Sequence, residues 1–342
     1  MIGILGFLCT RGLWMDMEQE ESPVPTIQQK FLMMRHELLK RYEGIDEEAY
    51  GVVAAMTLGD KSALDKEVRE VYSKTGASHV LALSGLHLMM IYGVVSFLVT
   101  WRRWRLFAQA LVVVCIWMFA FLVGLPSSVV RSATMITIYT VFATAHRTRK
   151  PFRTLIFTAV VMLLLRPESI RDIGFQLSFL AVTAILLFHP LLQQMIPSAV
   201  LWRHRWLRYL WGLTTISVSA QLGTAPLVAY YFGRLPVYFL LSNYVVIPLV
   251  TLILYEALLL FTLGWINILH PYIVDGISAT VGLLNRLLSA IAQWPGSSID
   301  HIHLGVAQLL LVYLMIGCTY VLITYSLTSV GYRSGWRPPL GG

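Results

Sequence analysis

The chain has 342 residues, of which 57% are hydrophobic and only 13% are charged. Soluble domains carry about a quarter charged residues, so this composition excludes an ordinary soluble protein and indicates a polytopic membrane protein. The charge is uneven, since residues 1–78 hold 9 Lys and Arg against 13 Asp and Glu, whereas residues 79–342 hold 17 against 5. The first segment is therefore expected to face water, and the rest to form a basic membrane domain.

The N-terminal part divides into two expected segments. Residues 1–26 form an apolar stub followed by an acidic linker that contains prolines. The stub is too short to span a bilayer, which takes about 20 helical residues, so it is either an interfacial anchor or the cut end of a longer protein. Residues 27–78 show amphipathic helices over 27–43 and 46–74, with a break near Gly59 and Asp60. Such helices pack on a membrane or on protein, here on the outer face.

Apolar stretches follow, and they predict an all-α membrane fold with about eight to nine spans. They cover residues 79–100, 106–124, 127–145, 152–166, 174–193, 208–232, 237–263, 273–294 and 304–328. Stretch 273–294 fits either a span or an interfacial helix, because Asn285 and Arg286 lie at its middle. Residues 329–342 are expected to form a C-terminal tail.

The basic residues of the connections predict the orientation. The loops around Arg102, Arg149 and Arg205 are strongly basic, and the connections between them are nearly neutral. Basic loops remain on the cytoplasmic side. The chain is therefore expected to be a multi-pass protein of the bacterial inner membrane, with residues 1–78 outside.

Two of the stretches are expected to be broken or re-entrant. Gly223 and Pro226 fall inside stretch 208–232, and Pro248 falls inside stretch 237–263. Broken helices at membrane depth line cavities or binding sites in many transporters. A proline kink with local repacking is the other interpretation.

The first apolar stretch contains a polar cluster. Ser84 and His87 are three residues apart and would share a helix face, and His79 would lie about a quarter turn away. Polar groups in a span usually face a cavity, a partner or a path. The cluster therefore fits a pore lining, a packing contact, a Ser–His pair or half of a metal site.

Other polar residues lie on later stretches. Arg131, just over one turn inside its span, would either snorkel to the outer surface or face a pore and meet phosphate. The remaining candidates are Asp172, Gln176, Gln221, Asn243 and Glu256. Polar stripes of this kind are either interhelical glue or the lining of a path, and their presence on several helices favours a path.

No metal or cofactor site is predicted. The three cysteines, Cys9, Cys115 and Cys318, lie in apolar stretches without ligand spacing. The run from Asp300 to His303 lacks an Asp-His continuation and is treated as loop. No glycine-rich phosphate loop that ends in Lys-Ser or Lys-Thr occurs.

Six motifs in order resemble those of the ComEC competence proteins, the inner-membrane DNA-uptake channels of natural transformation. They are residues 54–61 (AAMTLGDK), 79–87 (HVLALSGLH), 126–133 (PSSVVRSA), 174–179 (GFQLSF), 221–226 (QLGTAP) and 243–249 (NYVVIPL). The resemblance covers about residues 30–328. The family's outer oligonucleotide-binding domain and its metallo-β-lactamase-like domain have no counterpart in these 342 residues, so no nuclease activity is expected of them.

The resemblance implies a competence domain over residues 79–328 that translocates single-stranded DNA into the cytoplasm without being an enzyme. The residues expected to line the DNA path, from this resemblance and from the polar stripes described above, are His79, Ser84, His87, Arg131, Asp172, Gln176, Gln221, Asn243 and Glu256. The implied partners are single-stranded DNA, the lipid bilayer, a DNA receptor, a cytoplasmic helicase, a nuclease acting in trans, and further copies of the chain in a homo-oligomer.

Two other classes of protein fit the residues. The expected helix breaks also suit a small-molecule or lipid transporter, and the Ser–His pair also suits an intramembrane enzyme. A path for single-stranded DNA needs basic residues for phosphates and aromatic or amide groups for bases. The basic loops are not independent evidence for DNA, because they are also the ordinary signal of membrane orientation.

Overall fold

The computed structural model describes residues 27–98, 105–144 and 151–334, and these residues are mostly helical. The expected N-terminal stub and the loops around Arg102 and Arg149 lie outside the described residues. Three helices come first: α2 (Ile27–Lys40), α3 (Glu47–Leu58) and α4 (Lys66–Lys74). A short 3-10 turn, η1 (Ala77–Val80), connects α4 to the apolar part of the chain.

The apolar stretches all contain helices. These are α5 (Gly85–Leu98), α6 (Arg105–Leu122), α7 (Ser127–Thr144), α8 (Pro151–Leu165), α9 (Ile173–Gln193), α11 (Arg205–Phe232), α12 (Phe239–Leu263), α13 (His270–Ala292) and α14 (Val306–Ser334). Shorter elements are η3 (Pro167–Arg171), α10 (Ser198–Arg203), and the strands β1 (Leu235–Pro236) and β2 (Ser298–Ile299), which pair antiparallel. Helix α14 extends six residues beyond the predicted end of its stretch.

The described helices confirm the all-α membrane class but not the predicted number of spans. Four of them are long and apolar enough to cross a bilayer: α9, α12, α13 and the part of α14 up to Ser326. Shorter apolar helices occupy Gly85–Val95, Phe107–Leu122 and Pro151–Leu165.

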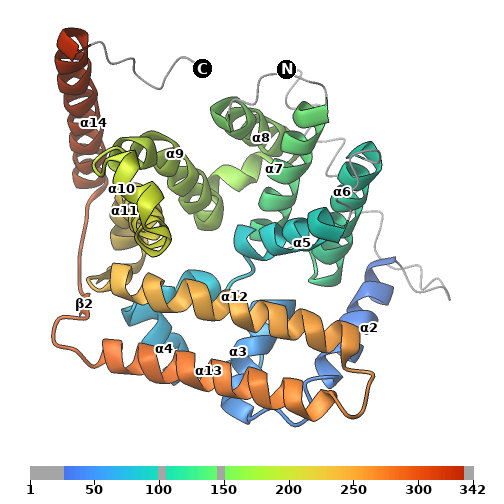
Figure 1. Cartoon of the computed structure of the whole chain (residues 1–342). Helices are drawn as coiled ribbons and strands as arrows, with labels where there is room; N and C mark the ends of the chain where they lie inside the picture. Colours follow the sequence, from blue (N-terminus) through green and yellow to red (C-terminus); the bar gives the residue numbers. More distant parts are fainter. Residues whose placement is uncertain (1–26, 99–104, 145–150, 335–342) are drawn as a thin grey trace, which may run out of the picture.

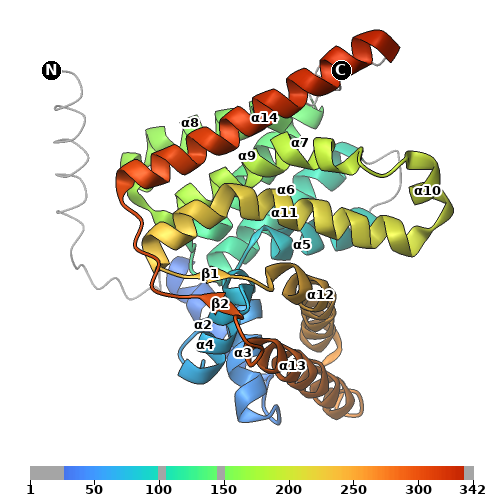
Figure 2. The ribbon, with the colours of Figure 1, turned by 90° about the vertical axis from the view of Figure 1, so that its left-hand side faces the viewer.

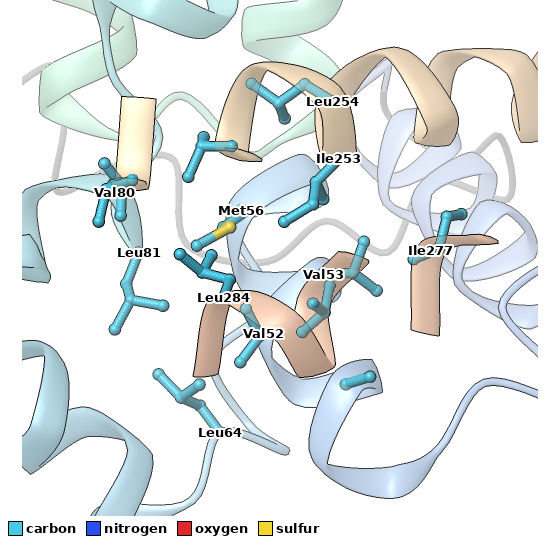
Figure 3. Packing of buried hydrophobic residues seen from close by; sticks show 14 of the residues in the cluster. Val52, Val53, Met56, Leu64, Val80, Leu81, Ile253, Leu254, Ile277 and Leu284 are labelled. Atoms are coloured by element: carbon cyan, nitrogen blue, oxygen red, sulfur yellow. The ribbon is translucent and has the colours of Figure 1, made fainter. Parts of the chain in front are cut away.

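The helices form two groups, which can be followed in Figures 1 and 2. Helices α12 and α13 run side by side, with α3 and α4 packed on them and α2 lying against α3 and α6. Helices α5 to α9, α11 and α14 form the other group. The largest hydrophobic cluster lies in the first group, where α3 meets α12 and α13. Its labelled members in Figure 3 are Val52, Val53, Met56, Leu64, Val80, Leu81, Ile253, Leu254, Ile277 and Leu284.

Helix α3 corrects part of the sequence prediction. Residues 46–74 were expected to carry an amphipathic surface helix, yet α3 is buried from Gly51 to Leu58. Glycine allows this close packing, because a Cβ on Gly51 would lie 2.4 Å from the carbonyl oxygen of Ala63. The predicted break is confirmed, since Gly59 ends α3 with φ 72° in the left-handed region that glycine tolerates.

The two predicted helix interruptions are wrong. Helix α11 continues through Pro226, and α12 continues through Pro248. Proline removes one backbone hydrogen bond, but neighbouring side chains can satisfy the freed groups. In α11 Pro226 leaves the Leu222 carbonyl without its helical partner. The Tyr313 hydroxyl of α14 donates a hydrogen bond of 2.9 Å to the next carbonyl, that of Gly223.

Gly223 also allows α11 to pack closely on α9. A Cβ at Gly223 would lie 2.5 Å from the Ala184 Cβ and 2.7 Å from the Leu180 carbonyl oxygen. Small residues at such crossings let two backbones approach. The glycine that sequence reasoning assigned to a helix break therefore serves a helix–helix contact.

A clasp of charged residues joins the two groups of helices. Arg234, between α11 and α12, bonds Glu70 of α4 at 2.9 Å, Ser73 of α4 at 3.1 Å and Asp300 beside β2. The hydrogen bond from Arg234 lowers the pKa of the Glu70 carboxyl below its ordinary value, because it stabilises the charged form. Strands β1 and β2 pair directly beside this clasp.

Candidate functional site

The starts of α5, α7 and α9 meet at one place, and each carries one of the sequence motifs. A Cβ on Gly85, the first residue of α5, would lie 3.3 Å from the Ser132 hydroxyl of α7. Arg131 of α7 in turn lies 3.4 Å from the carboxylate of Asp172, the N-cap residue of α9. We call Ser84, His87, Arg131 and Asp172 the helix-start cluster.

Ser84 and His87 meet through helix capping, not by sharing a helix face as predicted. Ser84 lies just before the first residue of α5, and its Oγ accepts a hydrogen bond of 3.3 Å from the Leu86 amide. The His87 Nδ1 accepts a bond of 3.0 Å from the Ser84 amide. This is the reciprocal arrangement of a capping box, with His in the position usually taken by Glu or Gln.

The capping arrangement assigns the His87 tautomer. Because Nδ1 accepts from the Ser84 amide, the neutral ring carries its proton on Nε2. Nε2 is buried beside the Met56 backbone and makes no hydrogen bond of ordinary geometry among the described residues. The Ser84 hydroxyl lies 3.1 Å from Nδ1, a distance that a catalytic Ser–His pair would also show. The helix-capping role of the two residues is enough to explain this distance.

A further motif packs on this start of α5. A Cβ on Gly59 would lie 2.7 Å from Leu83 Cδ1, and the backbone of Met56 lies beside the His87 ring. Residues 54–61 and 79–87 are thus in contact. The motifs at the starts of α7 (126–133) and α9 (174–179) lie next to them, so four of the six motifs are adjacent in space.

His79 does not join this cluster. It lies in the 3-10 turn η1, its side chain is exposed, and its Nδ1 is 3.0 Å from the Gly76 carbonyl oxygen. The predicted position a quarter turn from Ser84 and His87 on one helix is wrong, because residues 81–84 interrupt the helical path.

Arg131 is buried in contact with α9. It is 4% exposed, so the prediction that it snorkels to the surface is wrong. Its Nη1 donates to the Ser127 hydroxyl at 3.3 Å and to Asp172 Oδ2 at 3.4 Å. Asp172 Oδ1 accepts a bond of 2.9 Å from the Gly174 amide and so caps α9. The Asp172 carboxylate thus pairs with the buried Arg131 and also caps the N-terminus of α9.

The other predicted residues take part in contacts between helices. Tyr231 donates to Gln176 at 2.9 Å, and Asn243 donates to Ser217 at 3.1 Å. Thr280 of α13 donates to Glu256 at 3.1 Å, on the face where α12 meets α13. Gln221 is partly buried on α11. These bonds support the interhelical glue interpretation for several of the residues.

Sequence reasoning missed His189, which lies in α9. Its Nδ1 is 2.9 Å from the Thr215 hydroxyl of α11, and Thr215 also donates to Gln193 at 3.3 Å. An ionisable residue inside an apolar stretch is itself a signal, and it could have been found in residues 174–193. Within the described residues no group of three or more His, Cys, Asp or Glu is placed to hold a metal ion.

Comparison with known proteins gives relatives that are all longer than this chain. ComE operon protein 3 of Bacillus subtilis is 28% identical over 205 residues, which cover 60% of this chain and 25% of that protein. Recombination protein 2 of Haemophilus influenzae is 25% identical over 242 residues, covering 66% and 30%. An uncharacterized Aquifex aeolicus protein is 30% identical over 199 residues, covering 58% and 44%.

The chain thus spans between a quarter and a half of the length of these relatives. No solved structure matches it. The family model for competence proteins matches residues 56–325, which include the whole helix-start cluster and the helices that carry it. The chain belongs to the competence protein family.

Proposed function

We propose that this chain is the membrane part of a DNA-uptake system and that it translocates single-stranded DNA across the bacterial inner membrane. The observation that carries the proposal is the meeting of four family motifs around the buried Arg131. A guanidinium is the side chain best suited to phosphate, because its planar fork can donate two parallel hydrogen bonds. The match to the competence protein family and the similarity to ComE operon protein 3 and Recombination protein 2 support the same role.

The path proposed for DNA begins at the helix-start cluster. Ser84, His87, Arg131 and Asp172 lie at the start of it. The path is proposed to continue along α9, α11 and α12 past Gln176, Gln221 and Asn243. His79 and Glu256 are proposed as further lining residues outside the helix-start cluster. Amide and aromatic groups suit the bases of a single strand, and cations suit its phosphates. This part of the chain has no proposed catalytic role.

The proposed orientation places the helix-start cluster on the outer side of the membrane. The stretches that contain α5, α7 and α9 all begin on the side opposite the basic loops, and their starts are adjacent in space. Cysteine substitution at Arg149 tests the orientation in intact cells. Labelling of position 149 by an impermeant reagent added outside would contradict it.

The proposed partners are the DNA strand itself and other competence proteins, including a DNA receptor, a cytoplasmic helicase and a nuclease acting in trans. A homo-oligomer is also proposed. Cross-linking in a competent host would identify such contacts.

The test is replacement of the host's own channel. A transformable bacterium that lacks its membrane competence protein receives this chain, and entry of labelled single-stranded DNA into the cytoplasm is measured after external nuclease treatment. Restored uptake is the expected result. A chain that reaches the membrane in normal amounts and restores no uptake contradicts the proposal, and saturable uptake of a small solute would favour a transporter.

A further inference from the structure

We propose that Arg131 and the first turn of α9 form a phosphate site that the carboxylate of Asp172 occupies in this structure. A phosphodiester of the DNA strand then competes with Asp172 for the same donors. The inference rests on the proposed function and adds to it a specific exchange of anions at one place on the path.

The contacts of Arg131 leave donor capacity unused. The side chain is 4% exposed, and its Nε is buried without a hydrogen-bond partner among the described residues. Its two bonds through Nη1, to Ser127 and Asp172, are long at 3.3 and 3.4 Å. A buried guanidinium usually gains shorter, paired hydrogen bonds from its anion. The geometry is that of a cation whose present partner fills only part of the site.

Asp172 holds the two kinds of donor that a phosphate would use. One oxygen meets Arg131 and the other accepts from the Gly174 amide. The amides of a first helical turn lack partners within the helix, and the helix dipole favours an anion there. Helix α9 is 21 residues long, so this end carries a well-developed dipole. Arg131 supplies the second, independent element of the site.

Gly174 keeps this place open. A Cβ at this position would lie 3.3 Å from Asp172 Oδ1, 3.4 Å from Arg131 Nη2 and 3.5 Å from Arg131 Nη1. The backbone of Gly174 is not left-handed, so the missing side chain gives space and not conformational freedom. A methyl group here would occupy the volume between guanidinium and helix start.

The site can be reached and its anion can leave. The Asp172 side chain is 39% exposed, although its partner Arg131 is buried. The segment just before Asp172 carries the exposed residues Arg166, Glu168 and Arg171, so its charge is positive by one. Because the Asp172 carboxylate competes with each phosphate, the DNA strand binds weakly at this site. Weak binding suits a strand that must leave the site for translocation to continue.

The first experiment measures binding of a fluorescent single-stranded oligonucleotide to the purified full chain in lipid nanodiscs. Asp172→Asn removes the competing charge, and Asn caps a helix as well as Asp does. We expect about ten-fold tighter binding, since a buried Arg131 without its counter-charge gains more from phosphate. Asp275→Asn removes an exposed charge on α13 and is expected to change affinity less than about two-fold.

The second variant acts in the opposite direction. Gly174→Ala changes no charge and favours the helix, but it fills the site and is expected to weaken binding about ten-fold. An oligonucleotide with an uncharged methylphosphonate backbone is expected to bind the wild type and both variants alike. Opposite effects of the two substitutions, lost with the neutral probe, support the inference.

Other outcomes contradict it. If the wild type binds DNA and Asp172→Asn leaves the affinity unchanged or lowers it, Asp172 is only a structural partner of Arg131. The inference then fails, whereas the proposed function still stands. If Asp172→Asn does not fold, an unchanged affinity of Gly174→Ala overturns it. If neither the wild type nor any variant binds the phosphodiester probe, the proposed function fails as well.

Discussion

A guanidinium that is 4% exposed needs a counter-charge, and Asp172 provides one for Arg131. Breaking a buried pair by removing one partner is costly when the charge left behind is buried. Here the two partners differ, because Asp172 is 39% exposed and would stay hydrated without Arg131. Removing the arginine is therefore the milder change for the fold.

This difference makes Arg131 a useful position for a functional test. Arg131→Ala should abolish DNA uptake while the amount of protein in the membrane stays normal. Arg131→Lys should retain part of the uptake, because lysine keeps the charge but not the bidentate fork. Arg286→Ala, at an exposed position on α13, is the control. Normal uptake by Arg131→Ala would leave Arg131 as a purely structural residue.

The capping arrangement predicts the effects of changes at the start of α5. Ser84→Ala should lower stability by roughly 0.5–2 kcal/mol, the usual cost of losing an N-cap hydroxyl, and should leave most of the uptake. His87→Leu should be worse, since it removes the acceptor for the Ser84 amide. His87→Gln should be milder than Leu, because Gln also serves at this position of a capping box.

A nucleophilic serine would give a different pattern. Ser84→Ala would then eliminate activity, Ser84→Cys would keep some of it, and a serine-reactive probe would label Ser84. Thermal unfolding, uptake and probe labelling of the same variants separate the two accounts. Labelling at Ser84 would move the protein to the enzyme class.

At the scale of the helices, the contact between α9 and α11 depends on Gly223. Gly223→Ala should destabilise the protein by about 1–3 kcal/mol, the usual cost of overpacking, because the new Cβ meets Ala184 and the Leu180 carbonyl. Gly212→Ala, on the same helix with open space around it, should be neutral or slightly stabilising. Thermal unfolding of both variants in detergent checks this.

A second substitution tests the mechanism. Ala184→Gly combined with Gly223→Ala should restore part of the stability, since it removes one of the two close contacts. Full loss of stability in the double variant would assign the effect to the helix backbone instead.

The extents of the helices could largely be predicted from the sequence, and their contacts could not. Apolar stretches locate α5 to α9 and α11 to α14, because a helix in lipid needs a continuous apolar surface. The same logic placed residues 79–84 inside a helix, although Ser84 is a capping residue before it. Pro226 and Pro248 were taken for breaks because residue type alone does not show whether a helix continues through a proline, which depends on the packing of distant segments around it.

The candidate site shows the same division. Residue type and depth pointed to Ser84, His87, Arg131 and Asp172 individually. The pairing of Arg131 with Asp172 joins residues 41 apart, and no local pattern encodes it. Snorkelling was therefore a reasonable prediction for Arg131, and only the neighbouring helix start overrides it.

At the scale of the molecule, the clasp around Arg234 predicts a dependence on pH. The pKa of Glu70 is lowered from 4.5 in the folded protein, first through its hydrogen bond with Arg234. For Asp300 burial raises the pKa, but the bonds from Arg234 and Ser298 outweigh it and lower the pKa overall. Depressed carboxyl pKa values stabilise the fold above the unfolded value, and this stabilisation is lost as the pH falls through the folded value.

Arg234→Ala should therefore lower the thermal stability at pH 7, by about 1 kcal/mol or less, because the partners are partly exposed. The difference from the wild type should shrink as the pH falls below about 4. Arg286→Ala is the control. A difference that stays constant down to pH 3 would show that Arg234 acts through packing and not through the two carboxylates.

The hydrophobic cluster around α3 limits when this helix can pack during synthesis of the chain. Helix α3 is buried by α12 and α13, and the bond between Glu48 and Asn285 joins residues 237 positions apart. At ordinary translation rates this separation takes roughly ten seconds to a minute. During that time α3, which is buried from Gly51 to Leu58 in the folded chain, has been synthesised while its partners have not. Helix α3 is thus made well before the helices that bury it, and its packing is completed only after α13 has been made.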